Sequence, residues 1–101
     1  MAKHVLAFRN PPDQVPTADE EAAWSAWFRQ LGPAVVDFGH RVGRAQLVGS
    51  ESASGTAEGA LSGYVVIDAA DFQEALSLAD GCPGLRSGGL VEVGEVFVPA
   101  S

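Results

Sequence analysis

The chain has 101 residues, of which 47% are hydrophobic and 19% are charged, and its net charge is −7. A chain of this length usually forms one domain around a single core, so we expect one domain over residues 1–101. Only six Lys and Arg stand against thirteen Asp and Glu, which excludes a nucleic-acid binder, because phosphates need a basic surface. No apolar run approaches the roughly 20 residues that span a bilayer, and the single cysteine cannot form an internal disulfide. We therefore expect a cytoplasmic protein that binds neither nucleic acid nor membranes.

The first third of the chain predicts a strand followed by a long helix. Residues 3–9 form a short, mostly apolar run that stops at two prolines, as expected of a strand that leads into a loop. Thr17 and Glu20 have the spacing of a capping box, in which each side chain bonds the other residue's free backbone N–H. Apolar residues then recur at helical spacing, and these are Trp24, Trp27, Phe28, Leu31 and Val35. We interpret the tryptophans as core residues rather than a binding surface, because aromatic stripes mostly bury area.

The middle of the chain predicts interruptions of regular structure. Gly32 and Pro33 should kink the helix or make it restart. Residues 37–43 are punctuated by glycines, which is typical of a turn, and residues 44–48 are compatible with a second strand. Residues 49–59 contain no apolar residue beyond alanine, so we expect a long hairpin loop there.

The last third of the chain predicts a strand, a second helix and a final strand. Residues 61–67 are rich in β-branched and aromatic side chains, which favour a strand. Asp71 and Glu74 can cap a helix whose apolar face comprises Phe72, Ala75, Leu76 and Ala79. Gly81 suits the left-handed position that often follows a helix. Residues 90–98 then form the last strand.

The predicted order is β-α-β-β-α-β, the ferredoxin-like arrangement of an α+β domain with a four-stranded antiparallel sheet. Successive side chains of a strand point to opposite faces, and both faces are apolar here: Val65 and Ile67 oppose Tyr64 and Val66. Two helices can cover only one face of four strands. The other face would leave an apolar patch larger than a monomer normally exposes. We therefore expect a homodimer in which a second, identical sheet covers this face.

Several stretches of the chain carry a family resemblance. They are Gly63–Asp68, Asp71 with Glu74-Ala75-Leu76, Gly81-Cys82-Pro83 and Val91-Glu92-Val93, together with Ala26-Trp27-Phe28, Leu31-Gly32 and Val36-Asp37. Over nearly its whole length the chain resembles the YCII-related family, also called the DGPF-domain family. The resemblance implies the same fold, assembled as a dimeric α+β barrel with a cleft near the subunit contact. Some members are suggested to be enzymes because a His–Asp pair lies in that cleft. The Asp-Gly-Pro-Phe segment itself is absent here, and residues 50–59 stand in its place.

Asp37 and His40 are the candidate catalytic residues. They lie three positions apart at a helix-to-strand turn, where a carboxylate could orient the imidazole and raise its basicity, as a general base requires. The alternative interpretation is that Asp37 caps a turn and His40 is solvated, because such pairs are common at turns.

Four further residues are candidate ligand-binding groups, and they are His4, Ser62, Tyr64 and Arg86. His4 could face the dimer cleft or be a strand-end residue bonded to backbone or water. Ser62 and Tyr64 could offer hydroxyl groups, although Tyr64 could equally be an interface aromatic. Arg86 belongs to a glycine-rich segment that could present backbone N–H groups to an anion or be a plain loop.

Cys82 follows a helix C-terminus, whose negative end disfavours a thiolate, so we interpret it as a buried structural thiol. His4, His40 and Cys82 are scattered without metal-ligand spacing, so we expect no metal and no cofactor.

Two functions stay open. One is a protein that binds a small molecule in a cleft at or near the dimer interface, with possible acid–base chemistry by His40 and Asp37. The other is a non-catalytic accessory or protein-interaction subunit.

Overall fold

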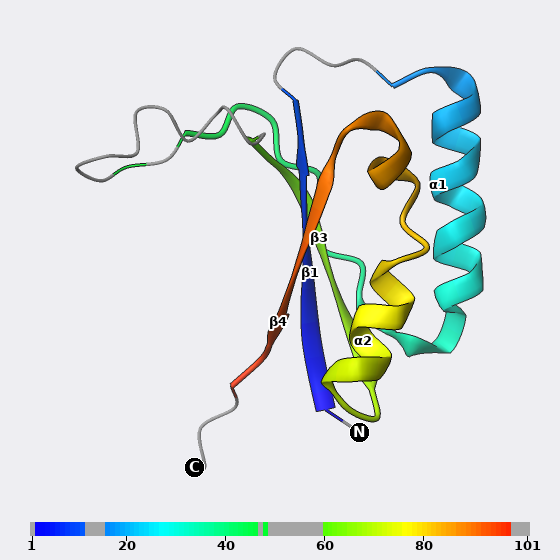
Figure 1. Cartoon of the computed structure of the whole chain (residues 1–101), viewed down its shortest axis with the longest axis vertical. Coiled ribbons are helices and arrows are strands. Elements are labelled where there is room, and N and C mark those ends of the chain that lie inside the picture. Colours follow the sequence, from blue (N-terminus) through cyan, green and yellow to red (C-terminus); the bar gives the residue numbers. More distant parts are fainter. Residues whose placement is uncertain (1, 12–15, 47, 49–59, 98–101) are drawn as a thin grey trace.

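A computed structural model describes residues 2–11, 16–46, 48 and 60–97. Its strands form one antiparallel sheet in the order β2-β3-β1-β4, and its helices lie on one face of that sheet (Figure 1). The strands are β1 (Ala2–Asn10), β2 (Val35–Asp37), β3 (Ala60–Ala69) and β4 (Leu90–Glu95). The α-helices are α1 (Ala18–Leu31) and α2 (Phe72–Ala79), and two short 3-10 helices, η1 (Gly32–Ala34) and η3 (Pro83–Ser87), follow them. The predicted ferredoxin-like α+β fold is therefore confirmed.

Helix α1 begins with the predicted capping box. The Thr17 side chain accepts a hydrogen bond from the Glu20 N–H at 3.1 Å, and the Thr17 N–H donates to the Glu20 carboxylate at 3.2 Å. The same carboxylate accepts a bond of 2.8 Å from the Ser87 hydroxyl in η3. The Ser87 hydroxyl and, next, the Thr17 N–H favour the charged carboxylate and lower the pKa of Glu20 below its ordinary value. One side chain thus joins the start of α1 to a segment far along the chain.

The second strand lies earlier in the chain than predicted. Helix α1 ends at Leu31 because Gly32 adopts a positive φ of 46°, and η1 then turns the chain so that Val35 enters the sheet opposite Ile67. The predicted strand over 44–48 is wrong, since none of its described residues is in a strand. The edge of β3 is already occupied by β2 and by an isolated bridge between Arg41 and Gly63. The predicted loop over 49–59 lies outside the described residues.

Two details near the end of the chain also differ from prediction. Gly81 has no positive φ, which is found instead at Gly32, Gly39 and Gly88. What Gly81 provides is close approach of two helices, because a Cβ there would lie 3.2 Å from the Trp27 indole nitrogen. Strand β4 stops at Glu95 rather than at residue 98, although the Val96 N–H still donates to the Lys3 carbonyl at 2.9 Å.

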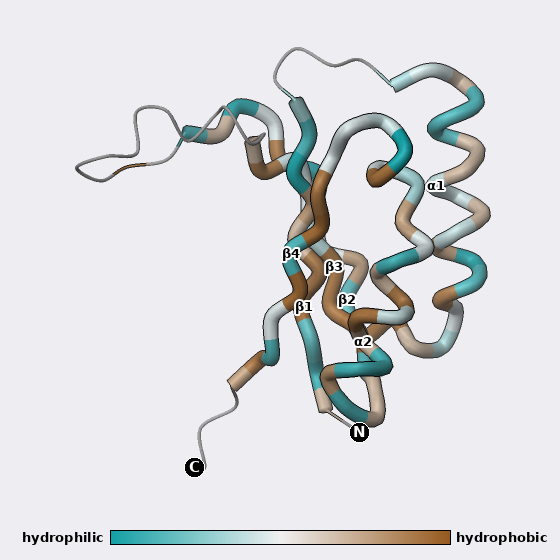
Figure 2. The backbone as a smooth tube through the Cα atoms, viewed as in Figure 1, coloured by the Kyte–Doolittle hydropathy of each residue, from teal (hydrophilic) through white to brown (hydrophobic). Residues whose placement is uncertain are grey.

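The core lies between the sheet and the helices. It consists of Leu6, Phe8, Trp27, Leu31, Val65, Ile67, Ala69, Ala75, Ala79 and Cys82. The prediction of a core role is confirmed for Trp27, which is 4% exposed and donates its indole N–H to the Leu78 carbonyl at 3.3 Å. Figure 2 shows the most hydrophobic stretches along the strands, whereas α1 is mostly pale or hydrophilic.

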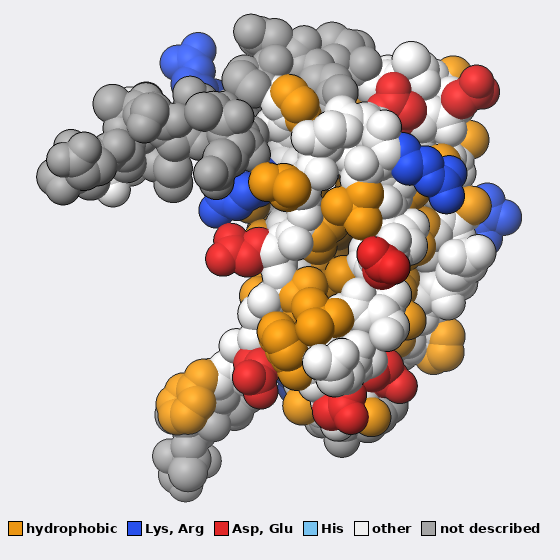
Figure 3. Space-filling model, in the orientation of Figure 1, with side chains coloured by type: hydrophobic (Ala, Val, Ile, Leu, Met, Phe, Trp, Pro, Cys, Tyr) orange, Lys and Arg blue, Asp and Glu red, His pale blue; other side chains and the backbone are white. Residues whose placement is uncertain are grey.

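Some apolar residues stay outside this core. Figure 3 shows hydrophobic side chains gathered where β4 and α2 adjoin, and α2 contributes the partly exposed Phe72 and Leu76. On the opposite side, no described helix covers the other face of the sheet (Figure 1). That face, here called the open face, carries Val5, Ala7, Tyr64 and Val66 at positions that alternate with core residues.

Glu20→Gln should make folding stability less sensitive to acid. The folded-state pKa of Glu20 lies below its unfolded value, so the bonds to the carboxylate stabilise the fold above about pH 4.5 and lose that effect as the pH falls through the folded-state pKa. The difference in the free energy of unfolding between the natural protein and Glu20→Gln should therefore be largest near pH 7 and should disappear in acid. Urea unfolding followed by circular dichroism between pH 3 and pH 7 measures it.

Glu21→Gln is the matched control, because it removes the same charge from the same helical turn without touching these bonds. Equal losses of stability for the two variants at pH 7 would contradict the assigned role of Glu20.

Candidate functional site

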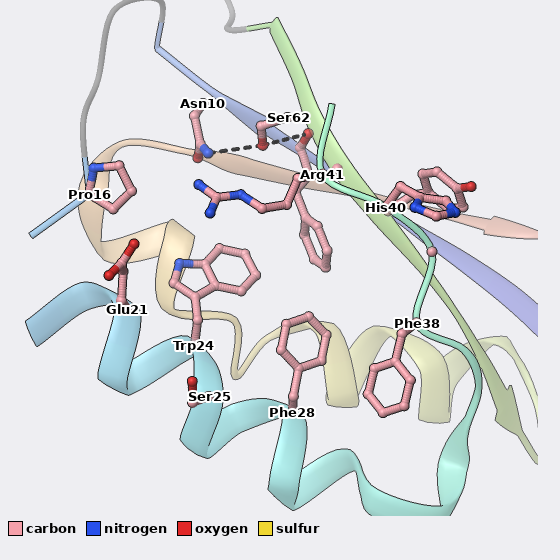
Figure 4. A pocket seen from close by; sticks show the side chains of 14 residues that line it. Asn10, Pro16, Glu21, Trp24, Ser25, Phe28, Phe38, His40, Arg41 and Ser62 are labelled. Atoms are coloured by element: carbon pink, nitrogen blue, oxygen red, sulfur yellow. Dashed lines mark hydrogen bonds between the residues drawn. The ribbon is translucent and has the colours of Figure 1, made fainter. Parts of the chain in front are cut away.

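A cavity of about 580 Å³ opens between α1 and the end of the sheet where β1 finishes (Figure 4). It is here called the groove. The groove is lined by Phe8, Asn10, Pro16, Glu21, Trp24, Ser25, Phe28, Phe38, Gly39, His40, Arg41, Ser62, Gly63 and Tyr64. This volume falls within the range typical of small-molecule sites.

An aromatic wall forms one side of the groove. Phe8 packs edge-on against Trp24 with ring centroids 4.9 Å apart, Trp24 lies 6.0 Å from Phe28, and Phe28 lies 6.2 Å from Phe38. The wall runs from the buried Phe8 out to Phe38, which is 67% exposed. Such a series of rings offers apolar aromatic surface to a ligand from the core outward.

The floor of the groove is Gly63, which has no side chain. Gly63 pairs with Phe8 of β1 on one side and with Arg41 on the other, and a Cβ added to it would lie 3.2 Å from the His40 carbonyl. Backbone hydrogen bonds fix this register, since the Tyr64 N–H donates to the His40 carbonyl and the Val42 N–H to the Ser62 carbonyl. Paired residues of neighbouring strands point to the same face. Arg41 therefore points into the groove on the α1 side.

His40 points the other way because it neighbours Arg41 in an extended segment. Figure 4 shows the imidazole directed away from the space between Arg41 and Trp24. The His40 ring is exposed and packs against Tyr64, with ring centroids 6.4 Å apart. His40 and Tyr64 thus form the rim of the groove on the side of the open face.

Asp37 caps a turn. Its carboxylate accepts a 2.8 Å hydrogen bond from the Gly39 N–H, and Gly39 has a positive φ of 63°. A Cβ at Gly39 would also collide with the Tyr64 carbonyl, so this tight turn requires glycine. Asp37 and His40 are both within the described chain, and no hydrogen bond or ion pair between them is found there. Acid–base catalysis by the two stays a prediction.

Ser62 lies at the polar end of the groove, at a bulge in the pairing of β1 with β3. Its hydroxyl accepts a 2.9 Å bond from the Asn10 amide and donates a 3.2 Å bond to the Phe8 carbonyl. The hydroxyl proton is therefore engaged by the backbone, and Ser62 can only accept a further bond from a ligand.

Two predicted ligand-binding residues do not line the groove. Arg86 is exposed in η3. His4 is fully buried on the helix side of the sheet, with its ring centroid 6.1 Å from that of Phe72. Nδ1 of His4 lies 3.1 Å from the Ala2 carbonyl, which assigns the proton to Nδ1, while Nε2 has no hydrogen-bond partner among the described residues.

Cys82 is 2% exposed, which confirms a buried thiol. Burial raises its pKa to about 11, against the opposing effect of hydrogen bonds from the Gly84 and Leu85 backbone. The thiol is therefore protonated at neutral pH and is no nucleophile under those conditions.

The sequence did not point to Arg41 or Asn10 as site residues, and it did not predict that Trp24 and Phe28 line a cavity. Trp24 and Phe28 belong to the apolar stripe of α1, but both are only partly buried. One edge of this stripe, with Trp27, packs into the core, and the other edge, with Trp24 and Phe28, lines the groove. Arg41 was assigned to a turn, and only its bridge to Gly63 shows where it points.

In the described part of the chain, no cluster of three or more His, Cys, Asp or Glu could hold a metal ion. Over those same residues, no helix is long and apolar enough to cross a membrane.

His4→Leu should leave the protein as stable as before or more stable by about 1 kcal/mol. The exchange removes a buried nitrogen that lacks a partner among the described residues, and this gain offsets the loss of the bond to the Ala2 carbonyl. Urea unfolding measures the difference. Leu6→Ala in the same strand is the control and should cost about 2–5 kcal/mol, as buried truncations do. A comparable loss for His4→Leu would mean that Nε2 has a partner after all.

The comparisons with known proteins agree with this architecture. No curated protein matches the chain. Residues 3–98 match the YCII-related domain, which is nearly the whole chain. The sheet with two helices on one face is consistent with that match. The chain belongs to the YCII-related family.

Proposed function

We propose that this YCII-related protein binds a small molecule in the groove. The observation that carries the proposal is the groove itself, a preformed cavity with an aromatic wall and a few polar groups, which is the usual composition of a ligand site. Its polar groups converge from separate elements: Glu21 and Ser25 from α1, Asn10 from β1, and Arg41 from the segment after β2. A site built on a sheet and a helix is held more rigidly than one made of loops alone.

We also propose that the protein is a homodimer whose two open faces meet. The open face carries Val5, Ala7, Tyr64 and Val66 over its two central strands, and Leu90 on β4 adds a half-exposed apolar side chain. Beyond β4, Phe97 adds a further apolar side chain that is 86% exposed. A second copy offers the same surface by two-fold symmetry. Such an interface would bring the partner close to His40 and Tyr64, at the rim of the groove.

Acid–base chemistry by His40 belongs to the same proposal. Its exposed ring at the rim is accessible to a ligand that leaves the groove toward the open face. One carboxylate oxygen of Asp37 is occupied by the Gly39 N–H, so the second oxygen would have to orient the imidazole. A ligand or a second copy that turns the His40 ring toward Asp37 would supply this arrangement.

Native mass spectrometry of freshly purified protein should show a dimer that carries an extra mass, which disappears on denaturation. His40→Ala should lower the fraction of protein that carries this mass, because it alters the rim. Gln30→Ala, on the exposed side of α1 and outside the groove, is the control and should retain the extra mass. A dimer without any extra mass would favour the non-catalytic accessory role instead.

Val66→Lys should convert the dimer to monomer, with a dissociation constant raised at least about tenfold, because it buries a charge at the centre of the proposed interface. Light scattering coupled to size exclusion at micromolar concentration measures this. Leu85→Lys places the same charge at an exposed apolar position in η3, on the helix side, and should stay dimeric. A Val66→Lys protein as dimeric as the control would place the interface elsewhere.

A further inference from the structure

We propose that the ligand of the groove is a small aromatic carboxylate, with Arg41 binding its carboxylate group. This inference rests on the proposed function of the groove and names the chemical class of its ligand. It depends on three features, which are the unpaired guanidinium, the shape of the wall beside it, and the charges at the mouth.

Arg41 supplies a positive charge to the described lining of the groove. Its side chain extends across the cavity toward the space above Trp24 (Figure 4). Among the described residues it has no hydrogen bond and no ion pair, and the ion pair found in that part of the chain joins Arg9 to Glu92. In a chain of net charge −7, a guanidinium left without a carboxylate beside an apolar wall is a site for an anion supplied from outside. Its planar fork matches both oxygens of a carboxylate.

The wall beside Arg41 favours an aromatic ligand. The rings of Phe8, Trp24 and Phe28 follow one another along the groove at centroid separations of 4.9 and 6.0 Å. Aromatic rings pack well on such surfaces in edge-to-face or offset geometry. Because Gly63 forms the floor, the ring of a ligand can lie between the wall and the sheet with its carboxylate on Arg41.

Among the described residues that line the groove, Glu21 is the acidic one. It belongs to the first turn of α1, where the helix dipole favours negative charge, and it is exposed to solvent. Glu21 and Arg41 form no ion pair. Figure 4 shows Glu21 beside Pro16 at the end of the groove toward which the exposed Arg41 side chain points, so its carboxylate opposes the binding of an anion that Arg41 attracts. Replacing Glu21 by Gln should tighten binding of an acid about two- to threefold.

The test uses benzoate and its neutral analogue benzamide, titrated into isotopically labelled protein and followed by NMR. Benzoate should shift the indole N–H signal of Trp24, which lines the groove. It should leave that of Trp27 nearly unchanged, because this indole is bonded to the Leu78 carbonyl inside the core. Benzamide should bind at least about tenfold more weakly, since it lacks the charge-assisted bonds to Arg41.

Arg41→Gln should lower the affinity for benzoate about tenfold and leave the affinity for benzamide unchanged. Arg44→Gln, three residues on and outside the groove, is the charge-matched control and should bind benzoate like the natural protein. If Arg41→Gln fails to fold, Arg41→Lys is the second variant, because it keeps the charge but loses the two-pronged guanidinium. Its affinity for benzoate should then be several-fold lower than that of the natural protein.

The two proposals fail in different ways. If benzamide binds as tightly as benzoate, and Arg41→Gln changes neither affinity, the groove binds small molecules but the assignment of a carboxylate is overturned. If neither compound shifts the Trp24 signal, both the aromatic carboxylate and the proposed binding role of the groove are overturned. An equal loss for Arg44→Gln would reduce the role of Arg41 to that of general surface charge.

Discussion

The groove depends on the register that places Phe8, Gly63 and Arg41 side by side across the sheet. The central position has no side chain, so the large residues on either side enclose a space instead of filling it. A slip of one residue would send Arg41 to the open face and His40 into the cavity, because neighbouring side chains alternate. The bulge at Ser62 and the backbone bonds on both sides of Arg41 hold this register in place. The chemistry available to the groove therefore follows from strand pairing.

The position of α1 sets the width of the groove. Its N-terminal end is tied to η3 by the bond between Glu20 and Ser87, and further along the helix the Trp27 indole is bonded to the last turns of α2. Gly81 allows this close approach to Trp27. Trp24 lies between these two attachments and Phe28 just beyond the second, and both side chains line the cavity. Anchoring a helix on both sides of a site restricts how far the site can collapse when it is empty.

Much of the fold was predictable from sequence because its signals are local. The capping box of Thr17 and Glu20, the apolar stripe of α1 and the Asp71 cap of α2 each depend on residues within one or two helical turns. Strand β2 was missed because Val35 fits the helical stripe as well as it fits a strand, and the outcome depends on Gly32 ending the helix. A three-residue strand has too few positions to show an alternating pattern of its own.

The site was less predictable because its residues meet through long-range pairing. Ser62, Tyr64 and His40 were named as candidates and do line the groove, whereas Asp37, His4 and Arg86 were named and do not. His4 shares the strand parity of core residues, but parity cannot tell which face the helices cover. Arg41 was overlooked since its direction depends on a bridge to Gly63, more than twenty positions away in the chain. Local spacing contains no information about such a partner.

The outer edge of β4 bears on how copies of this protein can meet. An edge strand has unpaired backbone groups that can recruit a strand from another molecule, and charged side chains are a common defence against this. Strand β4 lies at the edge of the sheet and carries the exposed carboxylates of Glu92 and Glu95. Two such edges would repel each other in a chain that is already strongly acidic. These carboxylates therefore disfavour the addition of a further strand at this edge of the sheet, and association through a face of the sheet does not require that edge.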